Sequence, residues 1–212
     1  MEKYYVLGGK SMFRRLSIFA AFVLLVAASG VQAQKQFGGD PTQLSFFSGT
    51  TTVVLSSDFT GALSTLEISA SAAFPGRIQM RNRTVFPITT GTLDAATLRG
   101  EIAHAGGLIL TKNATRVRLE SFIIDTTGAG GIVLTGLVSA NGTVVGRIPL
   151  FDLTLPSSAN GAVDVTVVRL DDVAVTLRPE AAAALNGAFS TTAFVAGFDI
   201  GTASVFGTTF GI

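Results

Sequence analysis

Few side chains in this sequence have the chemistry of a catalytic or metal-binding group, and the single histidine comes first among them. His104 lies in the stretch GEIAHAGGLIL, residues 100–110. A neutral imidazole can ligate haem iron and can exchange a proton near neutral pH. The stretch also fits a strand that ends at His104 and is followed by a glycine turn. We expect His104 to be a turn residue, and the alternative is that it is a ligand.

Three arginines in the stretch RIQMRNR form the main basic cluster of the sequence. They are Arg77, Arg81 and Arg83. Guanidinium groups bind carboxylates and phosphates, so the cluster is a candidate site for an anionic ligand or a cell-wall polymer. Arginines on an exposed strand face also cover apolar surface with their stems and need no ligand to do so. Both interpretations stay open.

The sequence argues against the common catalytic sites. It has no cysteine and no Gly-x-Ser-x-Gly motif, and one histidine is too few for a zinc site. Aspartates are scattered through the second half of the chain, and Asp171 and Asp172 are the densest pair. Neighbouring strand residues point to opposite faces, so we expect this pair to form a polar turn. A hydrolase that uses two carboxylates is the weakest alternative, and we expect no enzyme.

The N-terminus has the order of a cleavable export signal. Basic residues precede the apolar run LSIFAAFVLLVAA, which is 13 residues long, and small residues follow up to Ala33. A membrane-spanning helix needs about 20 apolar residues. We therefore predict a signal peptide over residues 1–33 with cleavage after Ala33, and Met12 as an alternative start. The mature protein would be secreted, or would lie at the cell surface or in the periplasm.

Removing residues 1–33 changes the electrostatic character of the chain. The segment carries four basic residues and one acidic residue, so the net charge changes from +1 to −2. The mature chain then has no basic excess that would attract a nucleic acid. Because cysteine is absent, no disulfide can stabilise it, and a chain of this length can be held together by burial alone.

Beyond residue 50 the pattern is that of short strands joined by turns. Runs of β-branched and apolar residues alternate with glycine, asparagine and aspartate at the intervals of all-β domains. Asn141-Gly142 predicts a type I′ hairpin between the two strands that flank it. The predicted strands are 51–55, 77–80, 84–88, 98–104, 108–112, 115–125, 132–140, 143–153, 163–170, 173–177 and 202–210. The predicted helices are 58–66 and 179–186, and Pro179 suits the first turn of the second helix.

We therefore predict a mainly β fold, a single antiparallel β-sandwich or barrel-like domain with two short helices over residues 51–212. Residues 34–50 are predicted to be a flexible lead-in. In the strand 115–125, Val117 and Leu119 should face inward because Arg116 and Arg118 alternate with them. The rest of the predicted core comprises Ile102, Leu108, Leu110, Phe122, Ile124, Leu134, Leu137, Val145, Ile148, Leu150, Val165, Val167, Val175 and Leu177.

Two segments resemble HtaA-type domains of bacterial cell surfaces. FPITTGTLDAATLRGEIAHAGGLIL (86–110) is similar to their Gly-β-His-Gly-Leu stretch, and VTLRPEAAAALNGAF (175–189) is similar to a segment near their C-terminal end. The order and spacing match over residues 54–205. The resemblance implies a β-rich fold and, from characterised members, haem binding.

The resemblance also implies a haem site that pairs a tyrosine of an N-terminal helical segment with a histidine. His104 matches the histidine position. The corresponding helical segment is SDFTGALSTL, which carries Phe59 and no tyrosine, and both tyrosines of the chain lie within residues 1–33. Ligation of haem by a phenolate is therefore excluded in the mature chain. Only His104, with Met80 as a second candidate, is left as an iron ligand.

We predict an exported, non-enzymatic binding or structural module of the bacterial cell envelope or exterior. Its partner would be a cell-envelope component or a small hydrophobic ligand, and a homo-oligomer is compatible with the sequence. The sharper alternative is an HtaA-like protein that binds haem or another hydrophobic small ligand through His104. Arg77, Arg81 and Arg83 are the other candidate ligand-binding residues, and we predict no catalytic or metal-binding residue.

Overall fold

The structure is a computed structural model that describes residues 43–211 except 81, 158–160 and 164–165. The predicted signal peptide, its cleavage site and Arg81 lie outside the described residues. Within them, no helix has the length and apolar character needed to span a membrane.

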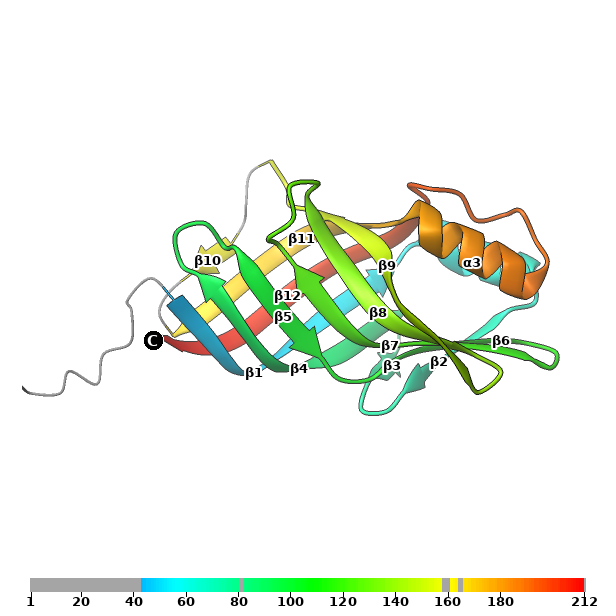
Figure 1. The fold of residues 1–212 in the computed structure, drawn as a ribbon, viewed down its shortest axis with the longest axis horizontal. Helices are drawn as coiled ribbons and strands as arrows, with labels where there is room; N and C mark the ends of the chain where they lie inside the picture. The colour runs from blue at the N-terminus through cyan, green and yellow to red at the C-terminus, as the bar shows by residue number, and fades with distance from the viewer. Residues whose placement is uncertain (1–42, 81, 158–160, 164–165, 212) are drawn as a thin grey trace, which may run out of the picture. The chain divides into compact units, whose positions relative to one another are not determined.

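Eight antiparallel strands close into a barrel (Figure 1). Around the ring the order is β7-β5-β4-β1-β12-β11-β9-β8, and the pairing of β8 with β7 completes it. An eight-stranded barrel has an interior that side chains fill or that holds one small ligand. The prediction of a mainly β, barrel-like domain is confirmed. The ring strands are β1 (Gln43–Leu55), β4 (Arg83–Asp94), β5 (Gly100–His104), β7 (Thr115–Asp125), β8 (Ile132–Ala140), β9 (Thr143–Thr154), β11 (Val167–Leu177) and β12 (Asp199–Gly211).

Four shorter strands extend the sheet outside the ring. β6 (Gly107–Lys112) pairs with β7 beyond the end of β5, and β2 (Ser69–Ala73) pairs with β6. β3 (Arg77–Gln79) pairs with β4, and β10 (Gly161–Val163) pairs with β11.

Alternation of apolar and polar residues sets the inner face of the barrel. Val117 and Leu119 are buried, whereas Arg116 is exposed and Arg118 is half-buried, as predicted. The β8–β9 hairpin also agrees with its prediction. Ala140 pairs with Thr143, and the two turn residues, Asn141 and Gly142, both have positive φ, 51° and 86°. These values are those of a type I′ turn.

The expected turn after His104 is wrong. β5 and β6 run in the same direction along one edge of β7, with Ile102 opposite Ile124 and Leu108 opposite Leu119. The chain is therefore kinked between them, not reversed. Gly106 makes the kink possible, because its φ is +81° and a Cβ there would lie 2.2 Å from the nitrogen of Gly76.

In the described part of the chain, two helices lie outside the sheet. α2 (Ser57–Thr65) begins after Ser56, whose hydroxyl accepts a hydrogen bond of 3.0 Å from the backbone N–H of Phe59. α3 (Pro179–Phe189) begins at the predicted proline and ends at Ser190, which has left-handed φ and ψ. It therefore runs one turn further than predicted. In Figure 1 α3 lies at one end of the barrel, and it contacts β9 and β7.

Several element boundaries differ from the prediction for identifiable reasons. β1 begins at Gln43, inside the expected flexible lead-in, and Leu44 and Phe46 are buried members of the core. β4 continues through Gly91. A glycine is required there, because a Cβ would lie 2.7 Å from the carbonyl oxygen of Glu101. The expected polar turn at Asp171 and Asp172 is a β-bulge inside the continuous strand β11, where Asp172 has positive φ.

Most of the predicted core is confirmed, with one clear exception. Val145 is 64% exposed because it lies near the start of β9, beyond the closed part of the barrel. Leu134, Leu137, Ile148 and Val167 are half-buried. The structure does not describe the side chain of Val165.

Candidate functional site

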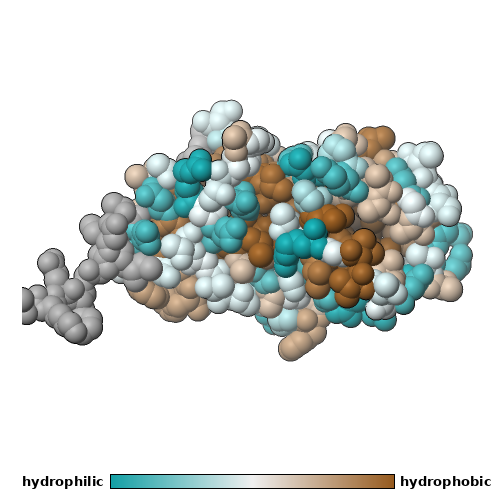
Figure 2. All heavy atoms as spheres, viewed as in Figure 1, coloured by the Kyte–Doolittle hydropathy of each residue, from teal (hydrophilic) through white to brown (hydrophobic). Residues whose placement is uncertain are grey.

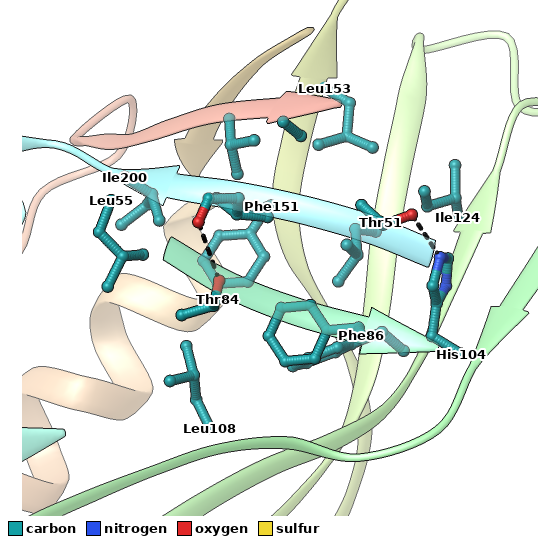
Figure 3. Close-up of a pocket in the computed structure, with 15 residues that line it drawn as sticks. Thr51, Leu55, Thr84, Phe86, His104, Leu108, Ile124, Phe151, Leu153 and Ile200 are labelled. Carbon is teal, nitrogen blue, oxygen red and sulfur yellow. Dashed lines mark hydrogen bonds between the residues drawn. The ribbon is translucent and has the colours of Figure 1, made fainter. Parts of the chain in front are cut away.

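The interior of the barrel is apolar and contains a small cavity at His104. The cavity measures about 40 Å³ and is lined by side chains from several ring strands. Figure 3 shows Phe86, Phe151, His104 and Thr51 among the side chains that surround it. A space of this size holds roughly one to three water molecules.

His104 lies inside the barrel because it shares a strand face with Ile102, two residues before it. Its side chain is 5% exposed. One ring nitrogen, Nε2, lies 2.7 Å from the hydroxyl oxygen of Thr51 and forms a hydrogen bond with it. The other, Nδ1, has no hydrogen-bond partner among the described residues. His104 is thus a buried polar group that is satisfied on one side only.

Burial keeps the His104 ring neutral. It lowers the pKa from 6.5 to about 4, and the backbone at Phe122 and Ile102 offsets part of this effect without forming a hydrogen bond to Nδ1. A charged imidazole would lose its hydration in this apolar space and gain no counter-ion. At neutral pH His104 is therefore an uncharged group, able to accept or donate one further hydrogen bond.

A larger hollow lies between α3 and the wall of the barrel. Its volume is about 330 Å³, within the range of small-molecule pockets, which is about 300–1,000 Å³. We call it the α3 groove. All of its lining residues are apolar, from β7, β8, β9, the end of β11 and α3: Val117, Leu119, Val138, Ala140, Val145, Ile148, Leu150, Phe151, Leu177, Ala181, Ala183, Ala184, Leu185, Gly187 and Ala188. Figure 2 shows hydrophobic residues gathered near α3 on the face that carries β8 and β9.

The small side chains of α3 create the α3 groove. Ala181, Ala184 and Ala188 recur at helical spacing and line the α3 groove along one stripe of the helix, on which Ala181 is buried and Ala184 is exposed. Leu185 and Phe189, on the same helix, are buried and anchor it to the core. A helix with leucines at the alanine positions would fill the space, whereas alanines leave it open.

The α3 groove and the His104 cavity are neighbours. Phe151 contributes to the lining of both and so forms part of the wall between them. A third hollow, of about 160 Å³, shares Ile124 and Leu153 with the His104 cavity. The three hollows are therefore adjacent, and side chains that they share form part of the walls between them.

The structure does not bring the predicted ligand-binding residues together. His104 faces the interior, whereas Arg77 on β3 and Arg83 on β4 are exposed, and Arg81 lies outside the described residues. Two aspartates of the barrel form surface ion pairs, and one of them, Asp171, lines the same shallow hollow as Arg83. Asp152 pairs with Arg178, and Asp171 pairs with Arg169 at 2.7 Å. Among the described residues no three His, Cys, Asp or Glu side chains cluster as metal ligands would.

Sequence reasoning missed the α3 groove. Its signal is the run AAAA (181–184) in α3, which promises a helix face of small side chains. That run says nothing about what the face opposes. The barrel wall that completes the α3 groove comes from strands far from α3 in the sequence, such as β7, which carries Val117 and Leu119.

Comparison with known proteins identifies the fold. No protein-family model matches the chain, and no curated protein matches its sequence. The C-terminal domain of HtaA from Corynebacterium glutamicum has the same fold, with a TM-score of 0.60 at 16% identity over 78% of this chain and 99% of that domain. The N-terminal domain of HtaA gives 0.58 at 14% identity, over 77% and 97%. The haem-binding protein HtaB from the same organism gives 0.50 at 9% identity, over 80% and 96%.

These identities are low, so the likeness concerns the fold alone. The expected resemblance to HtaA-type domains is confirmed at that level.

Proposed function

We propose that this protein is a non-enzymatic binding module that holds a small apolar molecule in the α3 groove. The observation that carries the proposal is the hollow of about 330 Å³ with a wholly apolar lining. Water in such a space finds no hydrogen-bond partners on its walls, so an apolar ligand displaces it at little cost. The likeness of the fold to HtaB, which binds haem, supports a binding role over a catalytic one.

The lining defines the chemistry of the ligand. With only alanine, valine, leucine, isoleucine, phenylalanine and glycine on its walls, the α3 groove offers no partner for a buried charge or a buried hydrogen-bonding group. The ligand's buried part is therefore a hydrocarbon, such as an alkyl chain or a small ring system. Any polar end must stay at the mouth, near exposed Val145.

Haem does not fit the cavity at His104. The space there is about 40 Å³, far smaller than a porphyrin, and Nε2 is already bonded to Thr51. Phe86 and Phe122 pack edge to face at 5.2 Å beside it and would have to separate. We therefore propose that the ligand does not bind at His104, and we assign His104 to the interior packing of the barrel.

An exported location at the cell envelope is part of the same proposal. It rests on the sequence pattern of residues 1–33 and is tested by N-terminal sequencing of the mature protein. A start at Gln34 supports it, and an intact N-terminus in the exported fraction contradicts it. The alternative of a structural envelope protein predicts concentration-dependent assembly, which analytical ultracentrifugation detects.

Titration with N-phenyl-1-naphthylamine tests the binding role. This uncharged aromatic probe fluoresces strongly in apolar surroundings, and we expect saturable binding to the purified protein. Ala184 lies at the exposed side of the α3 groove, so Ala184→Phe adds a ring across its opening and should weaken binding at least about tenfold, which corresponds to about 1.4 kcal/mol.

Ala129→Phe is the matched control for this titration. It adds the same ring at an exposed position in the loop after β7, so it should leave the affinity unchanged. Absence of saturable binding, or equal affinity for Ala184→Phe and the original protein, contradicts the proposal.

A further inference from the structure

The segment that joins β2 to β4 exposes large apolar side chains. Phe74 is 92% exposed, Met80 is 89% exposed and Ile78 is 38% exposed. In Figure 1 β2 and β3 lie on the outside of the barrel and their connection projects from its wall. Phenylalanine and methionine are usually buried in folded proteins, so their exposure on both sides of β3 marks a part of the surface that something else can cover.

Positive charge accompanies these apolar side chains. Residues 68–93 include no aspartate or glutamate, whereas three arginines occur there. Of these, Arg77 and Arg83 are described and exposed, and neither forms an ion pair within the part of the chain that the structure describes. They lie on the paired strands β3 and β4, where Gln79 is opposite Arg83.

We propose that this segment binds the surface of an anionic lipid bilayer. Phe74, Ile78 and Met80 would enter the boundary between headgroups and acyl chains, and Arg77 and Arg83 would contact lipid phosphates. Peripheral proteins bind membranes through this combination of apolar side chains and basic groups. Near an anionic leaflet each arginine adds to the attraction, and its long stem lets the charge stay at headgroup level.

The size of the patch favours a bilayer over a protein partner. An aromatic side chain buries about 150–250 Å², and Phe74 is the one aromatic among the three, while Ile78 is only 38% exposed, so the three side chains together supply less than about 500 Å². A stable protein interface needs about 800 Å² on each partner. A bilayer accepts isolated side chains and needs no complementary shape, and the surplus of positive charge matches anionic headgroups.

Co-sedimentation with vesicles tests the proposal. The purified protein is mixed with vesicles of phosphatidylcholine alone, or of phosphatidylcholine and phosphatidylglycerol in equal parts. We expect binding to the anionic vesicles and much weaker binding to the neutral ones. Phe74→Ser with Met80→Ser should lower the partition coefficient at least about tenfold on anionic vesicles. Arg77→Gln with Arg83→Gln should lower it about tenfold there and change it little on neutral ones.

Phe47→Ser is the matched control, because Phe47 is also exposed, at 61%, but lies on β1. It should bind like the original protein, and thermal unfolding checks that every variant is folded. Failure of the original protein to bind anionic vesicles overturns the proposal, as does an equal loss with Phe47→Ser. If the Phe74 and Met80 variant abolishes self-association while vesicles bind none of the proteins, the patch is a protein interface and the lipid proposal is wrong.

Discussion

We expect the protein to lose stability in mild acid, and replacing His104 and Thr51 together by apolar residues should remove most of that loss. The unfolded chain binds a proton at His104 with a pKa of 6.5, whereas in the folded protein the pKa is about 4. Between these values the unfolded state holds more protons, so the free energy of unfolding falls as the pH falls from 6.5 to 4. Above 6.5 the full stability is present, and below 4 this group causes no further change.

The size of the effect follows from the two pKa values. One pKa unit corresponds to about 1.4 kcal/mol, so the total loss is of the order of 3 kcal/mol. Linkage assigns about 2.5 kcal/mol of it to the interval between about pH 7.5 and about pH 4.5. Because His104 is only 5% exposed, solvent screens little of this effect.

Urea unfolding at both pH values measures the effect. The variant Thr51→Val with His104→Leu removes both partners of the buried hydrogen bond, so neither is left unsatisfied. We expect it to lose less than about 1 kcal/mol over the interval. Asp94 and Asp171 are half-buried, and hydrogen bonds from Thr97 and Arg169 lower the pKa of these aspartates, so they titrate mainly at lower pH. If the variant loses as much stability as the original protein, His104 is not the buried neutral group described above.

Three further predictions concern single features of the barrel. Gly106→Ala should lower the free energy of unfolding by at least about 3 kcal/mol, since φ is +81° and the new Cβ meets the backbone of Gly76. The control Gly130→Ala has open space around it and should change the free energy of unfolding by less than about 1 kcal/mol. Equal urea midpoints for the two variants would contradict the kink at Gly106. Phe86→Leu should cost about 1–3 kcal/mol through the lost edge-to-face contact with Phe122, and a thermal unfolding midpoint that does not fall would contradict it. Haemin titration should give no Soret change that depends on His104, and a saturable change lost in His104→Ala would show that the cavity opens for haem.

Local patterns predicted much of the fold because local physics decides those parts. β7 and β8 have the predicted bounds, since alternating side chains define a half-buried strand. The hairpin at Asn141-Gly142 follows from two residues that tolerate positive φ.

Closure of the barrel could not be read from the sequence in the same way. It depends on pairings such as Leu44 with Gly211, which join distant parts of the chain. The first part of β1 was not predicted as a strand, because SFFSGT has the composition of a loop. Which of its residues face inward is decided by the pairing of β1 with β12 and β4. The prediction ended β4 at residue 88, short of Gly91, because a glycine needed for close backbone approach looks the same in sequence as a glycine needed for a turn.

In the candidate site, too, the features set by local sequence could be predicted and those set by long-range pairing could not. The burial of His104 could have been predicted, because Ile102 on the same strand face was assigned to the core. Its hydrogen bond to Thr51 could not, since the two residues meet only through the order of strands in the barrel. The α3 groove likewise needs the placement of a helix against strands far away in the sequence.

The central claim is that a small apolar molecule binds in the α3 groove, and methyl NMR during titration with 1-decanol tests it most directly. Resonances of Ala184, Ala188 and Leu150 should shift saturably, whereas that of Leu93, a buried residue that does not line the α3 groove, should not move. Absence of saturable shifts, or shifts of equal size at Leu93, would contradict the account.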